Sequence, residues 1–270
     1  MFESVNKCID FTGKIVIVTG GSRGIGEGCA RVFLSAGATI VICSRDAETG
    51  MKTAERFCGE YGDNRCVFMP CDVASVADIQ RVIDETIRLF GRLDGLINNA
   101  GYHPPYEKID ETSNEAFLEL INTNLASMYN FCRLALPHLR KTKGTIVNMS
   151  SLVATIGQKL ACRYVSTKGG ILSLTKALAV DEAENGVRVN SISPGCIETP
   201  LGEEFRRLSS DPEREKELSN AFSPMKRVGN IYEVGTVCLF LASEMASFIT
   251  GADIIVSGGA ELAYGIKSEM

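Results

Sequence analysis

The sequence predicts an α/β protein of one domain, built on a doubly wound parallel sheet of seven strands with helices on both faces. Short runs of β-branched and apolar residues alternate with helix-length segments along the whole chain, which is the order of elements that gives a parallel sheet. The runs are apolar at successive positions, as expected for strands that helices cover on both faces. No glycine- and serine-rich linker interrupts the 270 residues, so a single domain over residues 1–270 is expected.

Each element of this fold has its own stretch of sequence. The predicted strands are 14–19, 39–43, 66–70, 93–98, 144–150, 187–193 and 252–257. The predicted helices between them are 26–36, 47–59, 75–90, 114–140, 162–185 and 231–242. The one irregular region, 196–227, is rich in Pro, Glu, Arg and Ser and lies between the last two strands. We expect it to form a substrate flap over the carboxyl edge of the sheet, where ligands bind in such folds.

Composition and charge exclude several classes of function. The net charge is −5 and lysines and arginines are spread through the sequence, which argues against a nucleic-acid partner. The N-terminal segment has no apolar core of a signal peptide, and no apolar run approaches the ~20 residues of a membrane span. The ten cysteines are scattered without a C-x-x-C pair, so we expect buried thiols and no metal site. A cytoplasmic protein without a membrane partner is the expectation.

A glycine-rich turn joins the first strand to the first helix. The segment TGGSRGIG occupies residues 19–26. Glycines let the backbone approach a pyrophosphate, and a helix N-terminus offers unpaired N–H donors. The spacing differs from the G-x-G-x-x-G fingerprint, so by itself the turn indicates either a phosphate site or a tight structural turn.

A second pattern concerns proton transfer. Tyr164 and Lys168 are four residues apart on a predicted helix and therefore share one face, and Ser151 follows the end of a strand. With the glycine-rich turn, NNAG (98–101) and PG (194–195), these residues make the chain resemble the short-chain dehydrogenase/reductase family along nearly its full length. That resemblance implies a Rossmann domain and NAD(P)-dependent hydride transfer between a secondary alcohol and a ketone.

The resemblance also implies roles for individual residues. The catalytic residues would be Asn124, Ser151, Tyr164 and Lys168. Asp72 and Val73 would lie at the adenine, Asn98 at the coenzyme ribose, and Ile197 and Thr199 at the nicotinamide. The full set of expected coenzyme contacts is Gly20, Ser22, Arg23, Gly24, Ile25, Gly26, Ser44, Arg45, Asp72, Val73, Asn98, Ala100, Gly101, Tyr164, Lys168, Pro194, Gly195, Ile197, Thr199 and Leu201.

The chemistry of these side chains agrees with the implied roles. A tyrosine titrates near ~10 in water and is a poor base at neutral pH, but the ammonium of Lys168 favours the phenolate of Tyr164. The Ser151 hydroxyl would hydrogen-bond the substrate oxygen, and Asn124 would hold a water that links Lys168 to solvent. A Tyr164→Phe variant is expected to lose turnover.

Further segments resemble one branch of the family, the 17β-hydroxysteroid dehydrogenases of type 14, also described as L-fucose dehydrogenases. They are 98–105, 150–158, 192–201 and 257–268. This resemblance implies a 17β-hydroxysteroid or a sugar such as L-fucose as substrate, with substrate contacts at His103, Ser151, Gln158, Tyr164 and Tyr264. It also implies a homotetramer, because the helices 114–140 and 162–185 are apolar over more surface than a sheet covers. The alternatives are a carbonyl reductase of the same family and, more remotely, a non-catalytic coenzyme-binding protein.

The second strand ends in the residues that select the coenzyme. An acidic residue after Cys43 would bind the ribose hydroxyls of NAD and repel the 2′-phosphate of NADP. This chain has Ser44 there, followed by Arg45, and Arg23 is a second cation in the glycine-rich turn. These residues favour NADP, with NAD or dual use left open, whereas Asp46 is expected to cap the next helix.

Overall fold

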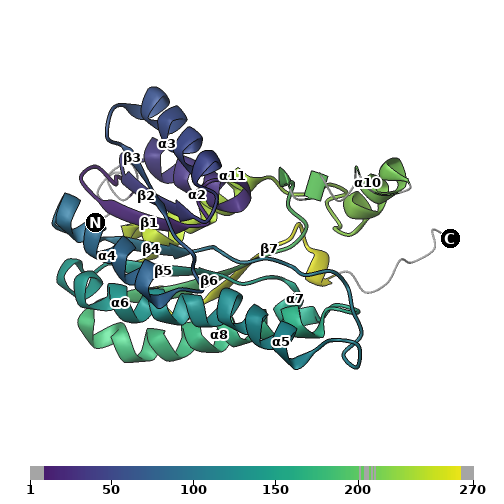
Figure 1. The fold of residues 1–270 in the computed structure, drawn as a ribbon. Helices are drawn as coiled ribbons and strands as arrows, with labels where there is room; N and C mark the ends of the chain where they lie inside the picture. The colour runs from purple at the N-terminus through teal and green to yellow at the C-terminus, as the bar shows by residue number, and fades with distance from the viewer. Residues whose placement is uncertain (1–8, 201, 204–206, 208, 210, 263–270) are drawn as a thin grey trace.

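The computed structural model is a seven-stranded parallel sheet with the order β3-β2-β1-β4-β5-β6-β7 (Figure 1). The structure describes residues 9–200, 202–203, 207, 209 and 211–262. The strands are β1 Ile15–Thr19, β2 Thr39–Ser44, β3 Cys66–Pro70, β4 Gly95–Asn98, β5 Thr145–Met149, β6 Arg188–Pro194 and β7 Asp253–Val256. Every strand pairing is parallel, so the predicted single doubly wound α/β domain is confirmed.

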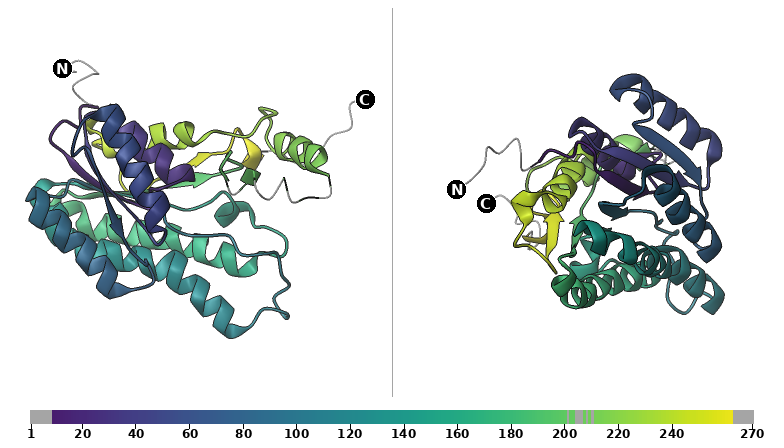
Figure 2. Two further views of the ribbon diagram at one scale, coloured as in Figure 1. Left: turned by 45° about the horizontal axis from the view of Figure 1, so that its top comes forward. Right: turned by 90° about the vertical axis from the view of Figure 1, so that its left-hand side faces the viewer.

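Helices cover the sheet on both sides, as Figure 2 shows. They are α2 Gly24–Ser35, α3 Ala47–Tyr61, α4 Val76–Phe90, α5 Asn114–Ile121, α6 Ser127–Thr142, α7 Val153–Ile156, α8 Cys162–Glu182, α10 Pro212–Ala221 and α11 Ile231–Ala242. Alternate residues of each strand supply the two cores: Val16 and Val18 pack with α2, α3 and α11, whereas Ile17 packs with α4, α6 and α8. This two-sided burial explains why the strands are apolar throughout.

The layer of α2 and α11 depends on two glycines. A Cβ on Gly28 would lie 2.5 Å from the carbonyl oxygen of Ile231, and one on Gly235 would lie 2.8 Å from that of Gly28. The two helix backbones therefore approach more closely than any side chain allows. This close contact fixes the position of α2 against α11. The N-terminus of α2 faces the carboxyl edge of the sheet.

The predicted helix 114–140 is divided in the structure. α5 passes into a single π-helical turn, Asn122–Ala126, before α6 begins. In the turn Ser127 N donates to the carbonyl of Asn122, and the Ser127 hydroxyl donates to that of Thr123 at 2.6 Å. The extra residue turns the Asn124 side chain inward, and π turns of this kind are frequent at functional sites.

The region 196–227, predicted to be irregular, contains regular structure among its described residues. An isolated bridge joins Ile197 to Gly229, and α10 begins at Pro212 with Asp211 as its cap. An Asp followed by Pro at the first helical position is a start signal that the sequence contained. α10 extends away from the body of the protein beyond the carboxyl edge of the sheet (Figures 1 and 2).

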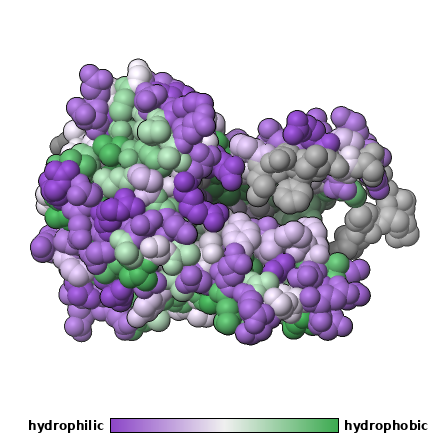
Figure 3. Space-filling model, viewed as in Figure 1, coloured by the Kyte–Doolittle hydropathy of each residue, from purple (hydrophilic) through white to green (hydrophobic). Residues whose placement is uncertain are grey.

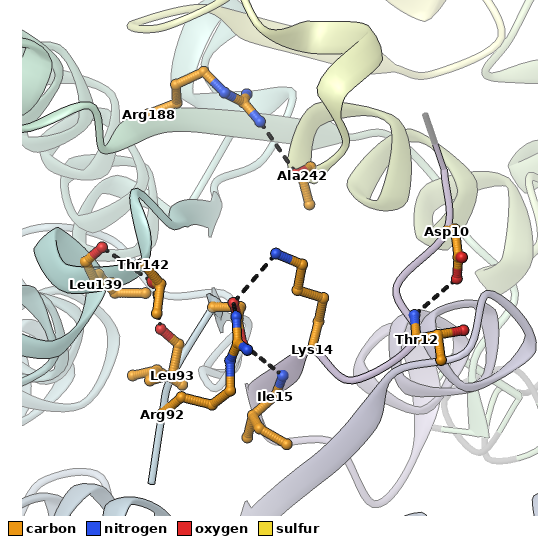
Figure 4. Close-up of polar contacts among 11 residues, drawn as sticks. Asp10, Thr12, Lys14, Ile15, Arg92, Leu93, Leu139, Thr142, Arg188 and Ala242 are labelled. Atoms are coloured by element: carbon orange, nitrogen blue, oxygen red, sulfur yellow. Dashed lines mark hydrogen bonds and ion pairs between the residues drawn. The ribbon is translucent and has the colours of Figure 1, made fainter. Parts of the chain in front are cut away.

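The opposite, amino edge of the sheet is closed by polar contacts (Figure 4). The buried carboxylate of Asp94 accepts from Ile15 N at 2.9 Å and from the Arg92 guanidinium at 2.6 and 2.8 Å. Arg188 donates to main-chain carbonyls at the end of α11, among them that of Ala242 at 3.1 Å. These contacts join the first residues of β1, β4 and β6 to their neighbours on the side remote from the carboxyl edge.

Most of the described cysteines are interior thiols, as expected. The buried ones are Cys29, Cys43, Cys66, Cys71, Cys132 and Cys238. Burial raises the pKa of both Cys66 and Cys132 to about 12, so these two are unreactive at neutral pH. Cys162 departs from the expectation and is exposed at the start of α8.

The described ranges contain neither a membrane-spanning helix nor a metal-binding cluster. None of the helices there is both long and apolar enough to span a membrane. The same residues contain no group of three or more His, Cys, Asp or Glu side chains arranged to hold a metal ion.

Candidate active site

A cavity of about 610 Å³ lies along the carboxyl ends of the central strands. Figure 3 shows this face of the molecule hollowed between the body and the projecting segment that contains α10. The lining residues come from the loops after β1 to β6 and from α8: Gly20, Ser22, Arg23, Gly24, Ile25, Ser44, Arg45, Asp46, Cys71, Val73, Asn99, Ala100, Gly101, Tyr102, His103, Thr123, Met149, Ser150, Ser151, Tyr164, Lys168, Pro194, Gly195, Ile197, Thr199 and Pro200. The cavity therefore connects the glycine-rich turn with Ser151, Tyr164 and Lys168, the two sets of site residues that the sequence predicts.

The glycine-rich turn forms one wall of the cavity from backbone. Gly20 and Gly24 have φ values of +63° and +59°, a conformation that strains any residue with a Cβ. A Cβ on Gly26 would lie 2.2 Å from the Gly20 carbonyl oxygen, so Gly26 closes the turn rather than lining the cavity. The N-terminus of α2 is left facing the space with its unpaired N–H groups. The glycine backbone of this wall fits close approach of the pyrophosphate of a dinucleotide, and Ser22, Arg23 and Ile25 line the same part of the cavity.

Serines and arginines line the end of the cavity beside β2. The Ser22 hydroxyl donates to Ser44 Oγ at 3.2 Å, and Ser44 Oγ donates to the carbonyl of Asp46 at 3.3 Å. Arg23 and Arg45 line the same end. The Asp46 carboxylate accepts from Thr49 N and Thr49 Oγ1 at 3.1 and 2.6 Å, so Asp46 caps α3 as expected.

Besides Gly26, two further expected coenzyme contacts are placed differently. Asn98 is fully buried, and its amide donates to Asn148 Oδ1 at 2.9 Å and to Cys132 Sγ at 3.3 Å. The expected ribose contact of the Asn98 side chain is therefore wrong; Asn99, which points the other way, lines the cavity. The exposed Asp72 accepts from Ala74 N at 3.0 Å in the turn before α4, outside the lining. Leu201, a further expected contact, lies outside the described residues.

Tyr164, Ser151 and Lys168 meet at the other end of the cavity. Tyr164 is on the first turn of α8, and Ser151 follows β5. Burial raises the pKa of Tyr164 to about 12, and its hydrogen bond with the Ser151 hydroxyl acts in the opposite direction. Burial thus favours the protonated phenol at neutral pH, and positive charge near the phenol oxygen would favour the phenolate that acts as a base.

Lys168 is the buried cation that faces this phenol. Its Nζ lies 5.6 Å from the centroid of the Tyr164 ring and donates to the carbonyl of Met149 at 2.9 Å. Ser150 Oγ donates to the carbonyl of Lys168 at 2.9 Å and so ties α8 to the end of β5. Burial lowers the pKa of Lys168 to about 8, because a buried ammonium is poorly solvated.

Asn124 is buried behind these residues, and its side chain is already engaged. Its Oδ1 accepts from Tyr102 N at 3.0 Å, and its Nδ2 donates to the carbonyl of Tyr102 at 2.9 Å and to Thr167 Oγ1 at 3.4 Å. The side chain therefore holds the loop after β4 against α8. Asn124 Oδ1 accepts one hydrogen bond, from Tyr102 N, and retains a second lone pair, so the role of Asn124 in holding a water stays a prediction.

Of the remaining expected substrate contacts, the structure brings two together. His103 lines the cavity, with its ring centroid 4.3 Å from that of Tyr164. Gln158 lies behind it, with Oε1 3.1 Å from His103 Nε2. Tyr264 lies outside the described residues. Tyr106, whose hydroxyl accepts from Gln158 Nε2 at 3.1 Å, was not predicted from the sequence, because no local pattern distinguishes a loop tyrosine.

Known proteins share both the sequence and this architecture. The sequence model of the family described as "Enoyl-(Acyl carrier protein) reductase" matches residues 20–261. An L-fucose dehydrogenase of Bos taurus is 48% identical over 258 residues, which make up 96% of this chain and 93% of that protein. The solved structure of gox2181 has a TM-score of 0.88 and 28% identity, and covers 95% of this chain and 99% of its own.

A second solved structure, the ligand-free aldohexose dehydrogenase of Thermoplasma acidophilum, has a TM-score of 0.85 and 32% identity, covering 96% of this chain and 98% of its own. The glycine turn, the cavity and the Tyr164–Lys168 pair agree with what these likenesses indicate. The chain belongs to the short-chain dehydrogenase/reductase family and is an NAD(P)-dependent oxidoreductase that acts on CH–OH groups.

Proposed function

We propose that the protein oxidises a ring carbinol of a sugar of the L-fucose type, with NADP as the preferred coenzyme. The observation that supports the substrate class is the polar wall of the cavity beside Tyr164, where His103 lines the cavity and is backed by the hydrogen-bonding side chains of Gln158 and Tyr106. A sugar needs several such groups to bind its hydroxyls, whereas a steroid needs an apolar cleft. The 48% identity with the L-fucose dehydrogenase of Bos taurus supports the same class.

In this proposal each catalytic side chain has one task. Tyr164 removes the carbinol proton, and Lys168 favours the phenolate through its buried positive charge. The Ser151 hydroxyl donates to the substrate oxygen as negative charge develops there. Asn124 holds the loop after β4, and with it His103, at the reacting carbon. NAD(P), when bound, supplies the hydride acceptor in oxidation and the donor in reduction.

The preference for NADP is proposed from the end of the cavity beside β2. Ser22, Ser44, Arg23 and Arg45 give it hydroxyl donors and two guanidinium groups. Guanidinium groups bind phosphate with two parallel hydrogen bonds. The carboxylate of Asp46, which repels phosphate, is held by Thr49 in the cap of α3. Because nothing here excludes unphosphorylated ribose, slower use of NAD is compatible with the proposal.

A hydroxysteroid, oxidised at its 17β-hydroxyl, is the second candidate. Leu218, Phe222 and Met225, on and after α10, expose 48%, 48% and 60% of their surface. Apolar side chains on a segment beyond the carboxyl edge would suit an apolar ring system. A carbonyl reductase with the same site differs only in its substrate and in the direction of the reaction.

We also propose a cytoplasmic homotetramer. Leu118 on α5, Tyr129 on α6 and Val180 on α8 expose 53%, 52% and 77% of their surface. An apolar surface of this kind on neighbouring helices supports association of identical subunits. Light scattering at micromolar concentration tests it, and a monomer would contradict it.

The substrate proposal is tested by assaying L-fucose and estradiol side by side with NADP⁺ and NAD⁺. We expect L-fucose to be oxidised, with the higher kcat/KM in the presence of NADP⁺. Oxidation of estradiol alone would favour the steroid candidate, and reduction of model ketones without oxidation of either alcohol would favour the carbonyl reductase.

A further inference from the structure

Beside the reacting side chains, three residues form a hydrogen-bonded chain that ends on the ring of Tyr164. Tyr106 Oη lies 3.1 Å from Gln158 Nε2, and Gln158 Oε1 lies 3.1 Å from His103 Nε2. The His103 ring is tilted by 46° against that of Tyr164. The Tyr106 ring meets that of His103 edge-on, with 5.2 Å between the centroids.

The two segments that carry this chain are tied to each other. Glu107 N donates to the carbonyl of Leu160 at 2.8 Å, and the Glu107 carboxylate pairs with Arg163 at 3.2 Å. Tyr106 precedes Glu107, and Gln158 lies two residues before Leu160. The backbone therefore holds Tyr106 and Gln158 side by side, close to the start of α8, which carries Tyr164 in its first turn.

The orientation of the His103 ring depends on its hydrogen bond with Gln158. Nδ1 lies 2.5 Å from the carbonyl oxygen of Pro104, which only accepts, so Nδ1 carries a proton. In a neutral ring Nε2 then needs a donor, and the amide of Gln158 provides one when its nitrogen faces the ring. Its oxygen then accepts from the Tyr106 hydroxyl. In a charged ring the amide is reversed and donates to Tyr106. In both arrangements the Tyr106 hydroxyl makes a hydrogen bond with the Gln158 amide atom that faces away from His103.

We propose that Tyr106 is a positioning residue for the substrate, acting through Gln158 to hold the His103 ring against Tyr164. This inference rests on the proposed oxidation of a sugar, because the ring it positions faces the carbinol. Tyr106 itself lies outside the cavity lining. Its hydroxyl matters because an amide held at one end only is free to rotate away from His103.

The test is a double-mutant cycle of Tyr106→Phe and Gln158→Leu with L-fucose as substrate. Phenylalanine keeps the ring contact with His103 and removes only the hydroxyl. We expect Tyr106→Phe to raise the KM for L-fucose about 3- to 10-fold, the effect of one lost hydrogen bond, with the KM for coenzyme unchanged. In the Gln158→Leu background the same substitution is expected to have no further effect. Tyr61→Phe, which loses a hydroxyl contact with Ser35 on α2, is the matched control.

A second readout needs no substrate. The chain has two histidines, so the ring nitrogens of a ¹⁵N-histidine-labelled enzyme are resolved by NMR and assigned with His138→Gln. Tyr106→Phe is expected to shift the His103 ring-nitrogen resonances in the direction seen for Gln158→Leu. Additive KM effects, or His103 resonances identical to those of the wild type, would overturn the inference. A wild type inactive on L-fucose would refute the proposed function, while the resonances still decide whether Tyr106 positions His103.

Discussion

The ammonium nitrogen of Lys168 lies 5.6 Å from the ring centroid of Tyr164 and is held there by the carbonyl of Met149. Both groups are buried, and burial acts on them in opposite ways. It raises the pKa of Tyr164 to about 12 and lowers that of Lys168 to about 8. A positive charge on Lys168 would favour the phenolate of Tyr164, and a phenolate there would favour the ammonium of Lys168.

Tyr164→Phe should abolish turnover, because the ring remains in place without a hydroxyl to accept the carbinol proton. We expect kcat to fall by at least ~10²-fold, the usual contribution of a general base, while the Kd for coenzyme stays near that of the wild type. Stopped-flow turnover and fluorescence titration with NADPH measure the two quantities. Tyr232→Phe, on α11 and outside the cavity, is the control. A near-normal rate for Tyr164→Phe would remove this residue from the mechanism.

The pH dependence should report the same pair. Oxidation requires the deprotonated phenol, so kcat/KM for the alcohol is expected to rise with pH. Removing the positive charge in Lys168→Met raises the pKa of Tyr164 and moves the rising limb to higher pH. A displacement of at least about one unit is expected, equivalent to about 1.4 kcal/mol. Ser151→Ala should displace it in the same direction, because the Ser151 hydrogen bond lowers the pKa of Tyr164. Profiles that superimpose on that of the wild type would contradict the pairing.

The strands and the reacting residues were predictable because both leave local patterns. β3 was predicted to the residue and the other strands to within two residues at each end, since buried parallel strands are continuous apolar runs. The assignment of Asn98 failed because neighbouring residues at a strand end point to opposite sides. An error of one position therefore exchanged a cavity residue for a core residue. The π turn at Asn122–Ala126 and the contacts of Tyr106 depend on tertiary packing, which cannot be predicted from the neighbouring residues in the sequence.

Coenzyme choice should depend on the charge at residue 44. In Ser44→Asp a carboxylate stands beside the proposed phosphate site, so kcat/KM with NADP⁺ is expected to fall at least ~10-fold. Two charges about 4 Å apart interact by up to about 4 kcal/mol at an effective dielectric of 20. Activity with NAD⁺ should be retained or rise, because a carboxylate binds ribose hydroxyls. Asparagine is similar in size to aspartate but uncharged. Ser44→Asn should therefore change the ratio of kcat/KM with NADP⁺ to kcat/KM with NAD⁺ much less than Ser44→Asp does. A wild type that strongly prefers NAD⁺ would refute the proposal that Ser44 and Arg45 select NADP.

The last prediction concerns stability at the amino edge of the sheet. The Asp94 side chain is 6% exposed and accepts from Ile15 N and from Arg92, with Lys14 Nζ 3.6 Å away. In Asp94→Asn the amide nitrogen replaces an oxygen and faces these donors. We expect the free energy of unfolding in urea to fall by about 1–3 kcal/mol, the cost of leaving buried hydrogen-bonding groups without partners.

The partly exposed ends of Arg92 and Lys14 keep this loss below that of a fully buried pair. The control is Glu85→Gln on α4, whose pair with Arg88 is solvent-exposed on both sides and should contribute less than ~1 kcal/mol. Asp94 lies before β4 and the coenzyme cavity lies after it, so the KM for coenzyme should not change. Equal losses for the two variants would mean that the Asp94 contacts add no more to stability than a surface ion pair. A raised KM would mean instead that the two edges of the sheet are coupled.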